Sequence, residues 1–100
     1  MSVSRISVVK FKSKEACDEM VESYTSNAPS EFPEAEQLLH IRIDDNTSIA
    51  VSLYKDKEAM ERASAARDKR MGARKDQYES VETHVGEVKL NHINLSLIHI

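Results

Sequence analysis

Apolar and polar residues alternate along residues 36–44 and again along residues 48–54. Side chains two positions apart leave the same face of an extended chain, so this period of two predicts two strands. Asp45 and Asn46 separate the two segments and have the side chains that favour tight turns. The pattern therefore predicts a hairpin in the middle of the chain.

Two further strands are predicted near the ends of the chain. Residues 3–11 and residues 81–93 are rich in β-branched side chains, which suit a pleated sheet. Gly86 interrupts the alternation of the second segment, and a glycine at such a place predicts a β-bulge.

Apolar residues recur at helical spacing between these strands. Ser13 stands where the N-cap of a first helix is expected. This helix should end at residues 27–29, because Pro29 disfavours helical geometry at the residue before it, Ala28. Asp56 is the expected N-cap of a second helix, which should break near Gly72 and continue as a shorter helical piece over residues 73–79. The order predicts an α+β class, ferredoxin-like split β-α-β-β-α-β fold, with a four-stranded antiparallel sheet and both helices on one face.

The two faces of this sheet differ in chemistry. The aliphatic face is expected to pack under the helices, and its members are Ile6, Val8, Leu39, Ile41, Ile43, Ile49, Val51 and Leu53. The mixed face combines apolar and polar side chains, namely Arg5, Ser7, Val9, Phe11, Leu38, His40, Arg42, Ala50, Ser52 and Tyr54. An exposed apolar patch usually marks an interface, and two-fold dimers are the commonest assembly. We therefore expect the mixed face to pair with a second copy in a homodimer.

Composition narrows the class of protein. One hundred residues suit one small domain, and the net charge of −3 argues against a generic nucleic-acid partner. The sequence has neither a signal-peptide pattern nor an apolar stretch long enough to span a membrane. Cys17 is the single cysteine and cannot form an internal disulfide, which favours a reducing compartment. We expect a cytoplasmic protein with no nucleic-acid or membrane partner.

The last residues look foreign to the rest of the chain. Residues 95–100 resemble the translation of a transposon-end adapter used in DNA sequencing libraries. We therefore expect residues 1–93 to form the single domain and residues 94–100 to be a non-native tail. The alternative is a genuine extension of the final strand.

The mixed face also holds a cluster of candidate functional residues. His40 and Arg42 are two apart on one predicted strand, so they share a face. Ser52 and Tyr54 lie on that face of the neighbouring strand, and Arg5 is expected beside them. A histidine, a phenol and an arginine together are able to bind and deprotonate an acidic phenol or to hold a carboxylate. The alternative is a polar layer inside a dimer interface, with Arg42 paired to Asp44 or to a partner carboxylate.

Cofactor sites find little support in the sequence. The four histidines show none of the short spacings typical of metal sites. The two glycines stand alone, so no phosphate-binding loop is indicated. We expect neither a metal nor an organic cofactor.

Two local strings resemble the antibiotic-biosynthesis-monooxygenase-like group of the dimeric α+β barrel superfamily. They are IAVSLYKDKEAM at residues 49–60 and Gly86-Glu87-Val88 in the last predicted strand. This resemblance implies a small homodimer, and some members are cofactor-free oxygenases acting on polycyclic phenols. Other members degrade haem with an Asn on the first strand, a Trp on the second helix and a His. This chain has no Trp, carries Ser7 on its first strand and has no His in residues 55–80, which disfavours haem degradation.

Two hypotheses follow. In the first, the protein is a cofactor-independent monooxygenase acting on an aromatic or quinone-like small molecule, with His40 and Tyr54 as catalytic residues and Arg5, Arg42 and Ser52 binding the substrate. In the second, it is a non-catalytic dimeric module that binds a ligand or serves a stress response. A cavity reached by both His40 and Tyr54 would favour the first hypothesis, and a filled, dry sheet interface would favour the second.

Overall fold

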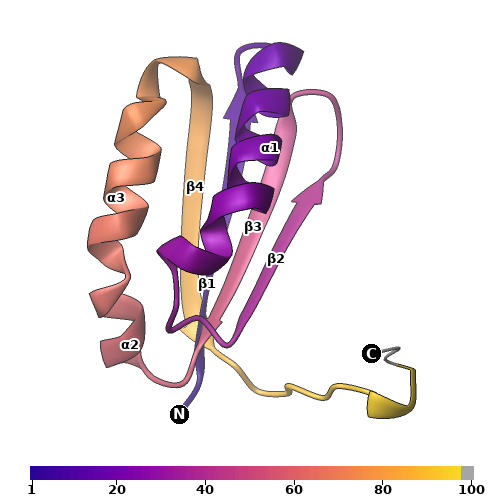
Figure 1. Cartoon of the computed structure of the whole chain (residues 1–100), viewed down its shortest axis with the longest axis vertical. Coiled ribbons are helices and arrows are strands. Elements are labelled where there is room, and N and C mark those ends of the chain that lie inside the picture. The colour runs from indigo at the N-terminus through magenta and orange to yellow at the C-terminus, as the bar shows by residue number, and fades with distance from the viewer. Residues whose placement is uncertain (98–100) are drawn as a thin grey trace.

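The chain forms one four-stranded antiparallel sheet with its helices packed on one side (Figure 1). The computed structural model describes residues 1–97. The strands lie in the order β2-β3-β1-β4, as in a ferredoxin-like fold, so the predicted fold class is confirmed. Along the chain the elements are β1 (Val3–Phe11), α1 (Lys14–Glu31), β2 (Gln37–Arg42), β3 (Thr47–Tyr54), α2 (Lys57–Arg62), α3 (Ser64–Ala73) and β4 (Tyr78–Glu87).

The helices cover the mixed face of the sheet, so the predicted assignment of the two faces is wrong. Phe11 and Tyr54 are fully buried there, and Arg5 is only 9% exposed. Ile6 and Leu39, on the aliphatic face, are 38% and 46% exposed. The alternation correctly showed which residues share a face, but both faces carry enough apolar surface to accept helices, so the pattern did not decide which face they cover.

The aliphatic face is therefore not covered by any helix within residues 1–97. The register places Leu39 opposite Val51 and Val51 opposite Ile6, so these side chains form one row across three strands. Ile41 and Ile43, which are 45% and 56% exposed, extend the patch. A contiguous aliphatic patch on a sheet usually marks an interface.

Both helix starts follow the sequence signals. The Ser13 hydroxyl accepts a hydrogen bond from the backbone N–H of Ala16 at 3.1 Å, and the Asp56 carboxylate accepts one from Ala59 at 2.8 Å. Each cap satisfies a backbone donor that has no partner inside its helix.

The end of α1 differs from the prediction. The helix continues through Pro29 to Glu31 instead of ending at residues 27–29. Proline removes one backbone hydrogen bond, but Ala28 and Phe32 are buried on either side of it, and the Phe32 N–H donates to the Ala28 carbonyl at 2.9 Å. Tertiary packing of these apolar side chains thus holds the last turn.

The second helical region is broken earlier than predicted. It divides at Ala63, between α2 and α3, while Gly72 lies inside α3. The predicted helical piece over residues 73–79 is reduced to a short 3₁₀ helix at Lys75–Gln77, because β4 already begins at Tyr78.

The last strand is shorter at its end than predicted. β4 stops at Glu87 and pairs with β1 without interruption at Gly86; the register shifts instead between Lys10 and Phe11. Residues 89–97 leave the sheet (Figure 1), and Leu95–Leu97 form a short 3₁₀ helix. The part of residues 94–100 that the structure describes does not extend the strand, and residues 98–100, which include His99, lie outside the described residues.

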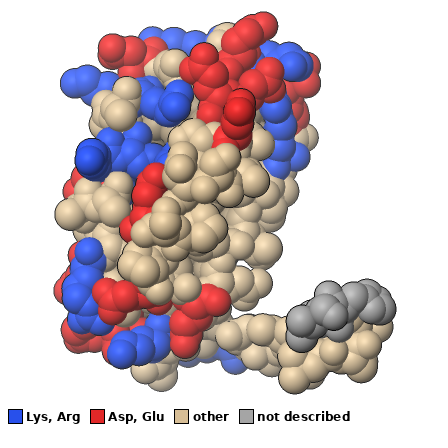
Figure 2. All heavy atoms as spheres, viewed as in Figure 1, with Lys and Arg blue, Asp and Glu red and all other residues tan. Residues whose placement is uncertain are grey.

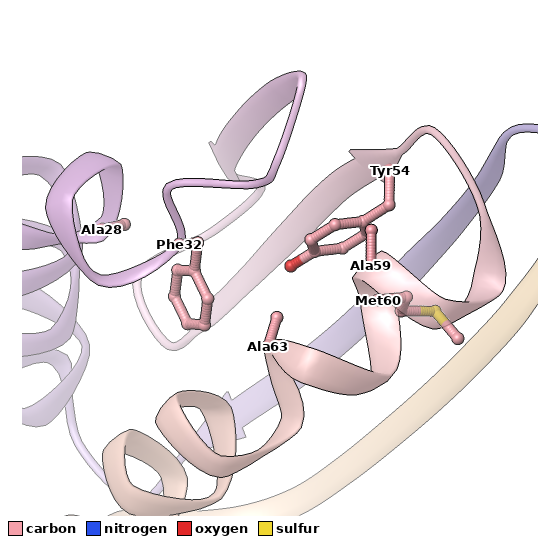
Figure 3. Close-up of a cluster of buried hydrophobic side chains, with 6 residues drawn as sticks. All are labelled: Ala28, Phe32, Tyr54, Ala59, Met60 and Ala63. Carbon is pink, nitrogen blue, oxygen red and sulfur yellow. The ribbon is translucent and has the colours of Figure 1, made fainter.

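The core between sheet and helices divides into two apolar clusters. One lies where β3 meets α2 and is formed by Ala28, Phe32, Tyr54, Ala59, Met60 and Ala63 (Figure 3). The other lies toward the opposite end of β1 and is formed by Val9, Phe11, Ala16, Cys17 and Met20. On the face seen in Figure 2, acidic and basic side chains mix at both ends of the molecule, and a largely uncharged area lies between them. Within residues 1–97 no helix is long and apolar enough to cross a membrane.

Candidate functional site

A small cavity lies between the two apolar clusters, with the sheet as its floor. The middle of this floor carries short side chains, from Ser7 on β1 and from Ser48, Ala50 and Ser52 on β3. Along these strands the short side chains point to the helix side, and the large aliphatic side chains between them point to the opposite face. Space therefore remains on the helix side. The resulting cavity measures about 50 Å³. Since one water needs roughly 10–15 Å³ by this kind of measure, the space fits a few waters or a small group.

Helices α1 and α3 form the wall opposite the floor. Helix α1 contributes Met20 and Tyr24, and α3 contributes Arg67, Arg70 and Met71. The two methionines are unbranched and flexible, so rotation of their side chains is the simplest way for this cavity to enlarge around a ring.

His40 reaches the cavity from β2 and is covered by an aromatic ring. The Tyr24 and His40 ring centroids lie 4.5 Å apart. Burial lowers the pKa of His40 below its ordinary value of 6.5, and the positive charge of Arg70 lowers it further. The imidazole is therefore neutral at pH 7 and able to accept a proton.

Tyr54 enters the same cavity from the end of β3. Its side chain is 1% exposed, and Figure 3 shows its hydroxyl directed into the interior toward Phe32. The structure thus places His40 and Tyr54, the two predicted catalytic residues, in the wall of one cavity, as the first hypothesis requires.

Arg5 and Ser52, two of the predicted substrate-binding residues, also line the cavity. They are opposite each other in the β1–β3 register, which puts both side chains on the helix side. Arg5 Nη2 donates to Ser64 Oγ at 3.2 Å and more weakly to the Met60 carbonyl at 3.5 Å. The guanidinium is thus held by neutral groups.

Arg42 lies elsewhere, although it too was predicted to bind substrate. Its Nη1 forms a 2.5 Å ion pair with Asp18 of α1, and its other nitrogens donate to the carbonyls of Asp44 and Asp45. These contacts tie the β2–β3 turn to α1. Arg42 does not reach the cavity, so its surroundings indicate a structural role.

Among the residues that sequence reasoning did not assign to the site, three carry its further polar chemistry, namely Tyr24, Arg67 and Arg70. Arg70 binds Glu31 through two nitrogens, at 2.5 and 2.8 Å, and its guanidinium carbon lies 5.4 Å from the centre of the Tyr24 ring. Burial raises the pKa of Tyr24, so its phenol stays protonated at pH 7. Ser64, Arg67 and Arg70 recur every three residues on α3, and this spacing was the available signal that they share a face.

Other chemistry finds no support near the cavity. Among residues 1–97 no three His, Cys, Asp or Glu side chains lie close enough together to hold a metal ion. Cys17 is fully buried in the second apolar cluster, and burial raises the pKa of its thiol, which disfavours the reactive thiolate.

Comparison with solved structures places this fold among known proteins. A dimeric ferredoxin-like protein from an uncultured marine organism superposes with a TM-score of 0.75 at 13% identity, over 93% of this chain and 92% of its own. SnoaB, a cofactor-independent oxygenase from Streptomyces nogalater, gives a TM-score of 0.63 at 16% identity, over 90% and 95%. The ActVA-Orf6 monooxygenase from Streptomyces coelicolor, in complex with nanaomycin D, gives 0.73 at 8% identity, over 93% and 92%.

At these identities the comparison establishes the fold. The chain shares a ferredoxin-like fold with these proteins, so the fold that the sequence resemblance implies is confirmed. No family model and no curated protein matches the sequence.

Proposed function

We propose that the protein is a cofactor-independent monooxygenase acting on a small phenolic or hydroquinone-like aromatic molecule. The observation that carries this proposal is the cavity shared by His40, neutral at pH 7, and Tyr54, with the Tyr24 and Phe32 rings beside them. Aromatic walls with a few polar groups are typical of small-molecule sites. The fold shared with SnoaB and ActVA-Orf6 supports the same reaction class by analogy.

The chemistry needs only the substrate, oxygen and a base. His40 accepts the phenolic proton, and the resulting phenolate is electron-rich enough to react with O₂. At a ring carbon that bears hydrogen, one oxygen atom becomes a carbonyl and the other leaves as water. The phenol supplies all four electrons and becomes a quinone, so no external reductant is required. Tyr54 holds the ring oxygen as its charge develops.

The proposed enzyme is a homodimer formed through the aliphatic face. In the single chain, Leu39, Ile41 and Ile43 are about half exposed on this face, and packing against a second copy buries them. A similar structure is described as dimeric, which supports the same assembly here. This arrangement leaves the cavity on the opposite side of the sheet, so catalysis and pairing use different faces.

Oxygen uptake by the full chain tests the proposal. Single-ring and two-ring phenols and hydroquinones are supplied in air-saturated buffer, and quinone formation is followed by absorbance. We expect uptake of one O₂ for each quinone formed from a phenol. His40→Gln is expected to lower kcat by about 10²–10⁴-fold, the usual contribution of a general base.

His92→Gln is the matched control because His92 is exposed and lies outside the sheet; it should keep wild-type activity. A flat oxygen trace for the wild-type protein across the panel, or full activity in His40→Gln, would contradict the proposal. Binding of aromatic ligands without oxygen uptake would instead favour a non-catalytic ligand-binding module.

A further inference from the structure

The cavity wall carries more positive than negative charge. Three guanidinium groups line it, from Arg5, Arg67 and Arg70. Glu31 pairs with Arg70, but across the described chain neither Arg5 nor Arg67 has an acidic side chain within ion-pair distance. Two of the three guanidiniums thus lack a carboxylate partner.

Hydroxyl groups occupy the donors of these two arginines instead. Arg67 Nη2 donates to Ser7 Oγ at 3.1 Å and to Thr83 Oγ1 at 2.8 Å, and Arg5 donates to Ser64 Oγ. Arg5 and Ser7 are two apart on β1, while Ser64 and Arg67 are three apart on α3, so each element offers one arginine and one serine to the other. The contacts fix both guanidiniums between β1 and α3 without neutralising them.

Two like charges are thereby held close together in a partly dry space. Burial lowers the pKa of Arg5, and the neighbouring charge of Arg67 lowers it further. Arg5 is buried, and holding a buried cation without a carboxylate partner costs free energy that a bound anion recovers. Arginine is also the side chain best suited to bind a carboxylate through two parallel hydrogen bonds.

We propose that the cavity selects an aromatic substrate that carries a carboxylate, and that Arg5 and Arg67 bind this group while Tyr24 and Tyr54 contact the ring. The inference deepens the proposed function because it names the substrate class of the same site. The cavity as it stands fits a small group, and rotation of Met20 and Met71 is expected to enlarge it for one ring rather than several. The aromatic side chains favour a ring over a bare inorganic anion. A hydroxylated benzoate has the required parts.

Binding to the full chain tests this inference separately from catalysis. Calorimetry compares 4-hydroxybenzoate with 4-hydroxybenzyl alcohol, which keeps the ring and the phenol but lacks the charge, and with inorganic phosphate, which has charge without a ring. We expect 4-hydroxybenzoate to bind at least about 10-fold more tightly than either, since charge-assisted hydrogen bonds are the strong ones. Its affinity should fall as salt is added.

Arginine variants then test which side chains bind the carboxylate. Arg5→Met and Arg67→Met keep an unbranched stem and remove the guanidinium. Each should weaken the binding of 4-hydroxybenzoate by about 10–100-fold and leave the affinity for the neutral alcohol unchanged. Arg67→Lys keeps the charge but loses the planar guanidinium. Its affinity for 4-hydroxybenzoate should lie between those of wild type and Arg67→Met. Arg62→Met is the control because Arg62 pairs with Glu34 on the exposed surface. Circular dichroism and Tm show which variants are folded.

Several outcomes would overturn the inference. They are equal binding of the acid and the alcohol, no binding of either in the millimolar range, preference for phosphate, or equal loss of both aromatic ligands in folded Arg67→Met. The proposed function fails independently. Carboxylate binding without oxygen uptake leaves the anion site standing and removes the oxygenase, whereas oxygen uptake restricted to neutral phenols does the reverse.

Discussion

The rings of Tyr24 and His40 pack at a centroid separation of 4.5 Å, joining helix α1 to the edge strand β2 at the cavity. This contact shields the imidazole from water, and Arg70, whose guanidinium carbon lies 5.4 Å from the centre of the Tyr24 ring, adds a positive charge nearby. Both effects keep His40 neutral. The contact between Tyr24 and His40 therefore packs α1 against β2 and also keeps the proposed base, His40, in its neutral form.

The lowered pKa of His40 makes the stability of the fold depend on pH. The unfolded chain protonates this side chain below about pH 6.5, whereas the folded chain resists protonation until a lower pH. The contribution of His40 to stability is therefore complete above pH 6.5 and is lost as pH falls below it. Thermal unfolding of wild type and His40→Gln between pH 5 and 8 should show the wild type losing more stability in acid. Parallel curves would contradict the stated pKa direction.

The Arg70–Glu31 pair should contribute more to stability than the Arg62–Glu34 pair. Arg70 is 8% and Glu31 32% exposed, while Arg62 and Glu34 are 53% and 41% exposed. Glu31→Gln leaves a buried guanidinium without its partner, at a cost of about 2–3 kcal/mol, somewhat below that of fully buried pairs. Glu34→Gln, the matched control, should change little because both groups are solvated. Urea unfolding measures the change in the free energy of unfolding for each variant. Equal changes for Glu31→Gln and Glu34→Gln would contradict the prediction.

Charge placed on the aliphatic face should separate the proposed dimer. Ile41 and Val81 are similarly exposed, at 45% and 41%, but Val81 is opposite Val9 and therefore lies on the helix side of the sheet. Ile41→Glu should raise the dimer dissociation constant at least about 30-fold, as for an interface hot spot, and Val81→Glu should leave it unchanged. Sedimentation equilibrium provides the measurement. A wild-type monomer at micromolar concentration would refute the dimer.

Filling the cavity floor should abolish ligand binding without unfolding the protein. Ala50 lies on the floor, so Ala50→Leu occupies the space that a ring would take. Ala65→Leu adds the same atoms at an exposed position of α3 and serves as the control. Calorimetry with 4-hydroxybenzoate should detect no binding to Ala50→Leu and unchanged binding to Ala65→Leu. Unchanged binding to folded Ala50→Leu would place the ligand elsewhere.

Local chemistry was enough to predict the elements and the fold. Alternation predicted the β2–β3 hairpin, and Ser13 and Asp56 cap their helices as expected, because caps and strand periodicity depend on neighbours in the sequence. The predicted boundaries are wrong where contacts between distant residues determine them. Packing of Phe32 stabilises the last turn of α1 beyond Pro29, and pairing with β1 makes β4 begin at Tyr78.

The candidate site shows the same division. The sequence by itself determined that Arg5, His40, Ser52 and Tyr54 share one face, since side-chain direction alternates along every strand. Only the tertiary structure decided that the helices cover this face, because the handedness of the connections between strands sets their side. Because the helices cover this face, it forms a cavity instead of the expected interface, with Tyr24, Arg67 and Arg70 supplied by the helices. The aliphatic face stays largely exposed in the single chain.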